Sequence, residues 1–265
     1  MKKLMITLFI TLMTFPLLAG FHGKAEVGTS SQDVFRGQLV EDGLMVVNPN
    51  VRLSYDKLRF QMDNVLNIEE THLTRSYMTL RYELGLDNGL KLTPGVSYHH
   101  FWADGFENIK EGLFESTAEV SLGLSYELYG ETLNHEHAFA VGLYSTHYLN
   151  VQADPGAYRG NLGFAMVSEY SKFGFGMSAD VSWGWFVKDK KQDIKGRVGQ
   201  IIDDMPNMQI PHTLNAKAYV MFKLTELLYG KVHGGTSIAI LPALRDALGG
   251  EAQIFHGGFN VGMEF

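Results

Sequence analysis

The stretch Phe173–Lys188 reads FGFGMSADVSWGWFVK and alternates between two kinds of side chain. Its odd-numbered positions are all apolar, whereas its even-numbered positions are mainly Gly, Ser and Asp. Successive side chains of a β-strand point to opposite faces. The stretch therefore predicts a strand with one apolar face and one small or polar face.

The same alternation recurs in Arg75–Leu86, Phe114–Leu128 and Leu214–Leu224. These stretches are longer than the about 5–6 residues of a typical globular strand and suit the about 9–11 residues of a tilted membrane strand. We therefore predict an all-β fold, a single transmembrane antiparallel β-barrel of about 12 strands, because single-chain outer-membrane barrels have even strand numbers. The predicted strands begin near Glu26, Val46, Leu58, Arg75, Leu90, Phe114, His137, Ala157, Phe173, Thr213, Tyr229 and Ala252.

The connections between these strands alternate in length, which separates a barrel from a β-sandwich of the same periodicity. Every second connection is short, and the longer ones include Asp189–His212, the longest of all. This parity predicts short periplasmic turns, longer extracellular loops and both termini in the periplasm. The Asp189–His212 loop is open to three interpretations: a constriction in the lumen, a partner-binding loop or a surface loop. The short connections are Asp56–Lys57, Asp87–Gly89, Gly130–Asn134, Ser171–Lys172 and Thr225–Glu226.

The N-terminus has the pattern of a secretory signal peptide. Two lysines follow the first Met, Leu4–Leu18 is largely apolar, and small residues come next. We predict a signal peptide over residues 1–25, with cleavage after Ala19 or Ala25, and a barrel over residues 26–265. Export in this way, together with the strand pattern, predicts a location in the bacterial outer membrane, with its lipid as a partner.

The composition excludes several other classes of function. The net charge of −7 and the lack of a dense basic stretch argue against a nucleic-acid partner. The chain has no Cys, so neither disulfides nor thiolate metal sites are available. The sequence has no phosphate-binding Gly-rich motif, and its paired histidines lack further converging ligands. We predict neither a cofactor nor a metal site.

The last eleven residues, Phe255–Phe265, form another alternating stretch that ends in Phe. This arrangement resembles the C-terminal signature of bacterial outer-membrane barrels. The resemblance implies that the barrel-assembly machinery recognises this strand. The residues that would form the signal on the apolar face are Phe259, Val261, Met263 and Phe265.

Four short motifs resemble a narrower group, the TorF-type family of porins. They are Phe35–Gly37, Asn48–Val51, Thr117–Leu124 and Asp154–Tyr158. The likeness extends loosely over most of the mature chain. It implies an outer-membrane barrel with a transport role and without a known substrate.

The polar faces of the predicted strands carry charges of both signs, which we expect to line the lumen and set its selectivity. We predict passive diffusion of small polar solutes through this charged lumen, with oligomeric state left open. A barrel of this size lies between small barrels filled by side chains and large barrels with a clear channel, so a closed structural or adhesive barrel is an alternative. The predicted pore-lining residues are Arg52, Arg59, Arg75, Arg81, Glu83, Lys91, Glu115, Glu119, Asp180, Lys217 and Lys223.

A lipid hydrolase is the rival from another class. His147–Asn150 resembles the His-Tyr-Ser-Asn stretch of outer-membrane lipid A deacylases, but Leu149 stands where that motif has its nucleophilic Ser. Ser145 lies two residues before His147 and so shares its face of the predicted strand, which makes it an alternative nucleophile. We predict that the chain is not an enzyme, because a Ser-x-His pair on a strand is usually only surface.

Overall fold

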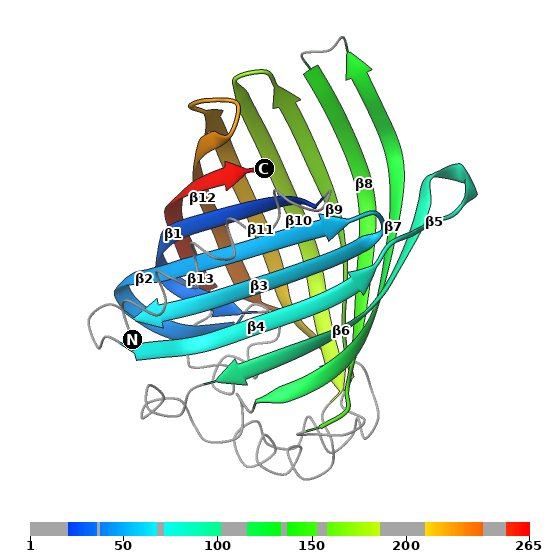
Figure 1. The fold of residues 1–265 in the computed structure, drawn as a ribbon. Helices are drawn as coiled ribbons and strands as arrows, with labels where there is room; N and C mark the ends of the chain where they lie inside the picture. The colour runs from blue at the N-terminus through cyan, green and yellow to red at the C-terminus, as the bar shows by residue number, and fades with distance from the viewer. Residues whose placement is uncertain are drawn as a thin grey trace, which may run out of the picture.

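The computed structural model describes residues 21–35, 38–67, 72–101, 116–133, 137–152, 158–185, 210–240 and 253–265, and these form one antiparallel sheet of 13 strands (Figure 1). The strands are β1 His22–Phe35, β2 Gln38–Tyr55, β3 Leu58–Asn67, β4 His72–Tyr82, β5 Leu84–Gly85, β6 Leu90–Phe101, β7 Thr117–Leu133, β8 His137–Asn150, β9 Tyr158–Tyr170, β10 Phe173–Trp185, β11 Ile210–Lys223, β12 Leu228–Ala239 and β13 Gln253–Glu264.

The sheet closes on itself. The first strand, β1, pairs with both β2 and the last strand, β13, while β6 pairs with β4 on one side and β7 on the other. The two-residue β5 continues β4 beyond Glu83 and pairs with the same β6. The wall is thus a closed antiparallel barrel of twelve strands plus this short extension, which confirms the predicted fold class.

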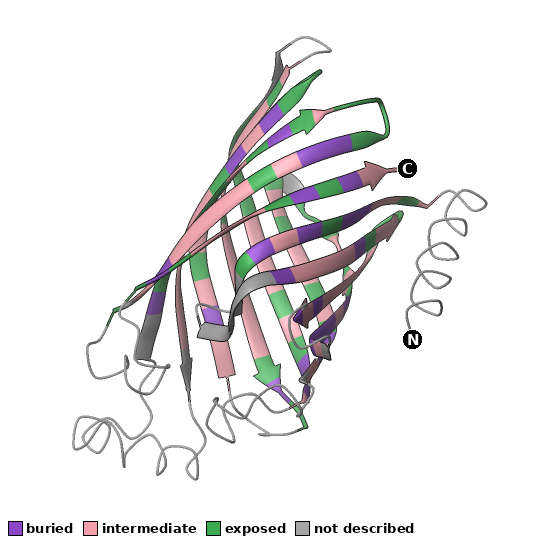
Figure 2. Ribbon diagram, turned by 90° about the vertical axis from the view of Figure 1, so that its left-hand side faces the viewer, coloured by how far each residue is buried: buried purple, intermediate pink, exposed green. Residues whose placement is uncertain are grey.

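Exposure alternates along the strands in the opposite sense to that of a water-soluble sheet, as the colours of Figure 2 illustrate. In β10, Phe173 and Met177 are exposed, whereas Gly174 and Gly176 between them are buried. The apolar face of each strand therefore points outward and the polar face points into the barrel. Exposed apolar side chains of this kind occur around the wall and include Leu80, Val96, Val120, Leu143, Leu162, Val220, Val232 and Phe259.

Sequence periodicity predicts the first residue of several strands correctly and that of others incorrectly. Four strands begin at the predicted residues, Leu58, Leu90, His137 and Phe173. The prediction was wrong for β2, which begins at Gln38 rather than near Val46, because register shifts in its pairing with β1 break the alternation there. Smaller differences occur for β1, β4, β11 and β12. The predicted starts at Phe114, Ala157 and Ala252 lie outside the described residues.

The described short connections lie at the end of the barrel where β1 starts and β13 stops. Asp56 in the β2–β3 turn and Asn88 in the 3-10 turn η2 (Asp87–Gly89) have positive φ angles of 48° and 70°. Gly23 N–H donates to the Phe265 carbonyl over 2.8 Å, and Glu264 N–H donates to Leu227 in the β11–β12 turn over 2.8 Å. The predicted sorting of turns to one end holds for these connections.

Within the described ranges, no helix is both long enough and apolar enough to cross a membrane. The predicted signal peptide through Gly20 lies outside the described residues, as do residues 189–209 of the predicted long loop. The prediction that this loop extends to His212 was wrong, because β11 already begins at Ile210.

Candidate functional site

The inward face of the barrel collects most of the charged side chains that the sequence marks as pore-lining. Three of them form a bridge between strands: Glu83 accepts from Arg59 over 3.3 Å and from Lys91 over 3.4 Å. Arg81 lies opposite Arg59 in the β3–β4 pairing. These residues share the face opposite to the exposed apolar side chains, and their role in a pore stays a prediction.

The other predicted residues lie elsewhere on the inward face. Arg52 on β2 is exposed, and Arg75 on β4 is buried. Lys217 and Lys223 both lie on β11, on the side of Asn215 and Tyr219. Glu115 falls outside the described residues.

Glu119 and Asp180 are held in polar clusters. Glu119 is 3% exposed and bonds to His99 over 3.1 Å, and His99 in turn stacks on Tyr77 with ring centroids 4.3 Å apart. Asp180 accepts hydrogen bonds from Tyr144, Ser182 and Asn215. Hydrogen-bonded clusters of this kind orient the side chains along the wall.

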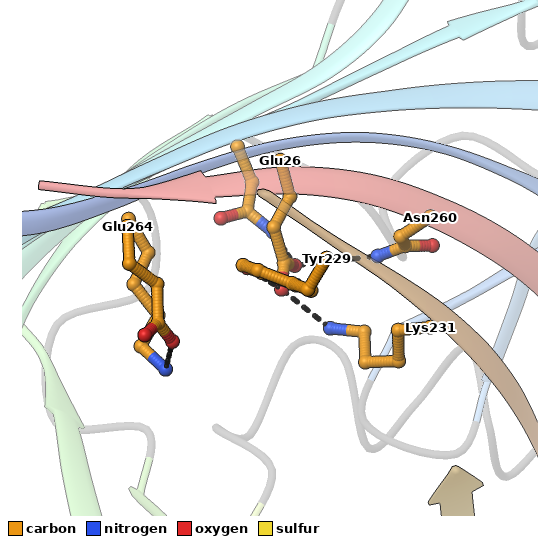
Figure 3. A network of polar contacts seen from close by, with 7 residues as sticks. Glu26, Tyr229, Lys231, Asn260 and Glu264 are labelled. Atoms are coloured by element: carbon orange, nitrogen blue, oxygen red, sulfur yellow. Dashed lines mark hydrogen bonds and ion pairs between the residues drawn. The ribbon is translucent and has the colours of Figure 1, made fainter. Parts of the chain in front are cut away.

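A carboxylate that sequence reasoning left out of the site, Glu26, forms the densest of these networks (Figure 3). Its Oε1 accepts from Tyr229 OH over 2.6 Å and from Lys231 Nζ over 2.7 Å. Its Oε2 accepts from the amides of Asn50 over 3.0 Å and Asn260 over 3.2 Å. The network ties β1 to β2, β12 and β13, so it spans the seam where the first strand meets the last.

The sequence did contain a signal for Glu26. Lys24, Glu26, Gly28 and Ser30 alternate with small or apolar residues, as in the other strands. The strand starts at His22, four residues before the predicted start of the barrel at residue 26. The predicted barrel therefore omits the first part of this alternating stretch.

Large inward side chains lie flat against the wall because the neighbouring strand offers them glycine. A Cβ at Gly176 would overlap the Tyr219 ring, and one at Gly262 would overlap the Tyr229 ring. At Gly163 it would overlap the Ala179 carbonyl oxygen and lie 2.9 Å from Tyr144 Cζ. A residue larger than glycine at position 176 or 262 would displace the tyrosine ring from the wall.

Ser145 and His147 lie together on the outward face of β8, with Ser145 Oγ 3.0 Å from His147 Nε2. Ser145 has one hydroxyl proton, and it donates this proton to the Asn161 carbonyl over 2.6 Å. His147 Nε2 must then donate to the hydroxyl oxygen, while its Nδ1 bonds to Tyr158 OH. A general base would have to accept from Ser145 instead, so this arrangement disfavours nucleophilic catalysis.

In the part of the chain that the structure describes, no three His, Asp or Glu side chains gather as potential metal ligands.

Neither a scan against protein-family models nor a search of curated proteins finds a match. Solved structures do match over nearly the whole chain. The KdgM porin in complex with disordered oligogalacturonate is 8% identical, with 91% of this chain and 99% of that chain covered and a TM-score of 0.50.

The NanC porin is 12% identical, covers 92% and 98%, and has a TM-score of 0.48. The COG4313 outer membrane channel from Pseudomonas putida F1 is 13% identical, covers 95% and 98%, and has a TM-score of 0.46. These matches do not confirm the narrower TorF-type resemblance. At such identities the likeness concerns the fold alone, and the chain has the β-barrel fold of outer-membrane porins.

Proposed function

We propose that this chain is an outer-membrane porin through which small polar solutes diffuse passively. The observation that carries the proposal is the inward face, where charged and hydroxyl side chains line the wall and the large rings of Tyr219 and Tyr229 lie over glycines. Such a wall would keep these rings out of the centre of the lumen and leave room there for water. The charges on the wall would then set which solutes pass.

The outward face supports the proposed location. Exposed apolar side chains occur on strand after strand, and a large exposed apolar surface on a protein needs a partner. A lipid bilayer is such a partner, and a closed barrel leaves no unpaired strand edge within it. We also propose that the barrel-assembly machinery recognises the last strand. Of the predicted signal residues, Phe259 and Val261 are exposed, at 48% and 46%.

The second candidate, a closed structural or adhesive barrel, is favoured by the buried inward clusters. In these clusters, polar groups that would face water in an open pore bond to one another instead. The clusters are Glu119 with His99, and Glu26 with its four partners. Twelve strands enclose less space than the about 16–18 strands of barrels with a clear aqueous channel. Conductance separates the two candidates directly.

The test uses the protein expressed from the full sequence, purified from membranes in detergent and added to planar bilayers. We expect discrete current steps. Ser178→Trp on the inward face of β10 would shrink the steps, and the matched change Val220→Trp on the outward face of β11 would leave them unchanged. An absence of steps from folded protein would sink the porin proposal in favour of a closed barrel.

A further inference from the structure

One wall of the lumen, formed by β1 to β4 near the end with the short turns, concentrates positive charge. Lys24 on β1 lies opposite Arg52 on β2, and Arg59 on β3 lies opposite Arg81 on β4. Like charges directly opposite each other on neighbouring strands are destabilising. The stability of the sheet therefore does not explain why these four cations share one surface, which we call the basic wall.

Two of the four cations form no direct ion pair with a described carboxylate. Lys24 bonds to Glu264, and Arg59 shares Glu83 with Lys91. Within the described ranges, neither Arg52 nor Arg81 forms an ion pair. Arg81 donates to Tyr77 OH over 3.3 Å and faces Gly95 across its pairing with β6, so no side chain from that strand opposes it.

The carboxylates whose charge reaches Arg52 are already hydrogen-bonded. Asp63 accepts from Gln61 over 2.5 Å, and Glu26 holds Lys231. Arg52 itself is exposed. Its guanidinium group therefore retains donors for a bound solute.

A cavity of about 590 Å³ adjoins the basic wall, and all four cations line it. Its polar lining adds Ser54, Gln61 and Thr79, and its acidic residues are Glu264, which is bonded to Lys24, and Glu226 at the turn. Pockets that hold small organic molecules span about 300–1,000 Å³. The cavity thus has room for such a molecule beside its positive groups.

We propose that the basic wall is a binding site for solutes that carry carboxylate or phosphate oxyanions, and that the channel favours small organic acids. Guanidinium groups present donors in a planar fork that matches these oxyanions, which lysine does not. The net charge of the whole chain, −7, would by itself attract cations, so the preference is a property of this wall. The proposed passage of organic acids rests on the proposed porin function, whereas the proposed binding of these acids does not.

The test has two readouts, both on the full protein. In planar bilayers across a KCl gradient, the reversal potential reports anion preference, and citrate serves as the probe that blocks the current. In detergent micelles, titration calorimetry measures citrate binding without any need for conduction. Arg52→Gln combined with Arg81→Gln should weaken citrate binding and block by about tenfold or more.

Lys217→Gln combined with Lys223→Gln is the matched control, because it removes two inward cations that do not line the cavity. It should change citrate binding by about twofold or less. Arg52→Lys combined with Arg81→Lys keeps the charge and removes the fork, so it should retain anion preference and bind citrate more weakly. Circular dichroism checks that each variant is folded.

Current steps without anion preference, or block by spermidine in place of citrate, would overturn the basic-wall site and leave the porin proposal intact. An equal loss in the Lys217 and Lys223 control would also overturn it. Citrate binding in micelles without current steps would support the site and refute the porin.

Discussion

Replacing Glu26 with Gln should destabilise the barrel through the charge it leaves behind. Glu26 is 5% exposed, and the side chain of its ion-pair partner Lys231 is 17% exposed. Removing one member of a buried pair typically costs about 3–5 kcal/mol, because the remaining charge is buried and unpaired. Since Lys231 keeps some contact with water, we expect a loss of about 3 kcal/mol, at the lower end of that range.

The neighbouring pair Lys24–Glu264 supplies the matched control, and Figure 3 labels its Glu264 beside the Glu26 network. Its side chains are 44% and 31% exposed, and pairs of this kind contribute about 0–1 kcal/mol. Glu264→Gln should therefore shift the free energy of unfolding by no more than this small amount. Equilibrium urea unfolding in micelles, followed by tryptophan fluorescence, measures both variants.

Lys231→Met completes a double-mutant cycle with Glu26→Gln. Lys231→Met alone should cost less than the Gln substitution, because Tyr229, Asn50 and Asn260 still donate to the Glu26 carboxylate. The double variant should be more stable than the sum of the two losses predicts, with a coupling of about 1–3 kcal/mol. Additive losses, or a Glu26→Gln variant as stable as Glu264→Gln, would refute the claim that the pair is energetically coupled.

Three further outcomes follow from the same geometry. Gly176→Val should displace the Tyr219 ring into the lumen and lower the single-channel conductance, and unchanged steps would show that the ring does not border the pore. Val232→Arg, on the exposed face near the middle of β12, should cost about 2–4 kcal/mol in lipid by urea titration, and a variant of unchanged stability would place that face outside the bilayer core. N-terminal sequencing of the exported protein should begin at Gly20. Cleavage after Ala25 would remove Gly23 and Lys24, which bond to Phe265 and Glu264. A sequence that starts at Glu26 would contradict this prediction.

How well strand ends can be predicted depends on what borders them. Asp56–Lys57 and Asp87–Gly89 contain residues suited to positive φ angles, so the strands after these turns, at Leu58 and Leu90, begin where the sequence predicts. The pairing of β1 with β2 carries register shifts between Ser30 and Gln32 and between Asp33 and Val34. Such bulges interrupt the period of two, and the sequence pattern loses the strand although the backbone continues it.

The face of the strand on which a side chain lies follows from the local sequence. The residue that the side chain contacts does not. Alternation alone places Arg59, Glu83 and Lys91 on one face, and the structure adds the bridge between them. The contact between Glu26 and Lys231 joins residues 205 positions apart and depends on the register of β1, β13 and β12. Periodicity does not fix how strands are staggered around a barrel, so it could not reveal this contact.

The Glu26 network and the basic wall differ in how many of their charged groups have a partner within the chain. This difference indicates a structural role for the Glu26 network and a binding role for the basic wall. Glu26 has four donors and lies at the seam, where a slip of one residue in β1 would turn its carboxylate toward the apolar face. Such a slip would bury an unpaired charge, so the network specifies the register that closes the barrel. Arg52 and Arg81 form no ion pair with any described residue and line an open cavity. A solute that brings its own negative charge would pair directly with these two guanidinium groups, which no described carboxylate does.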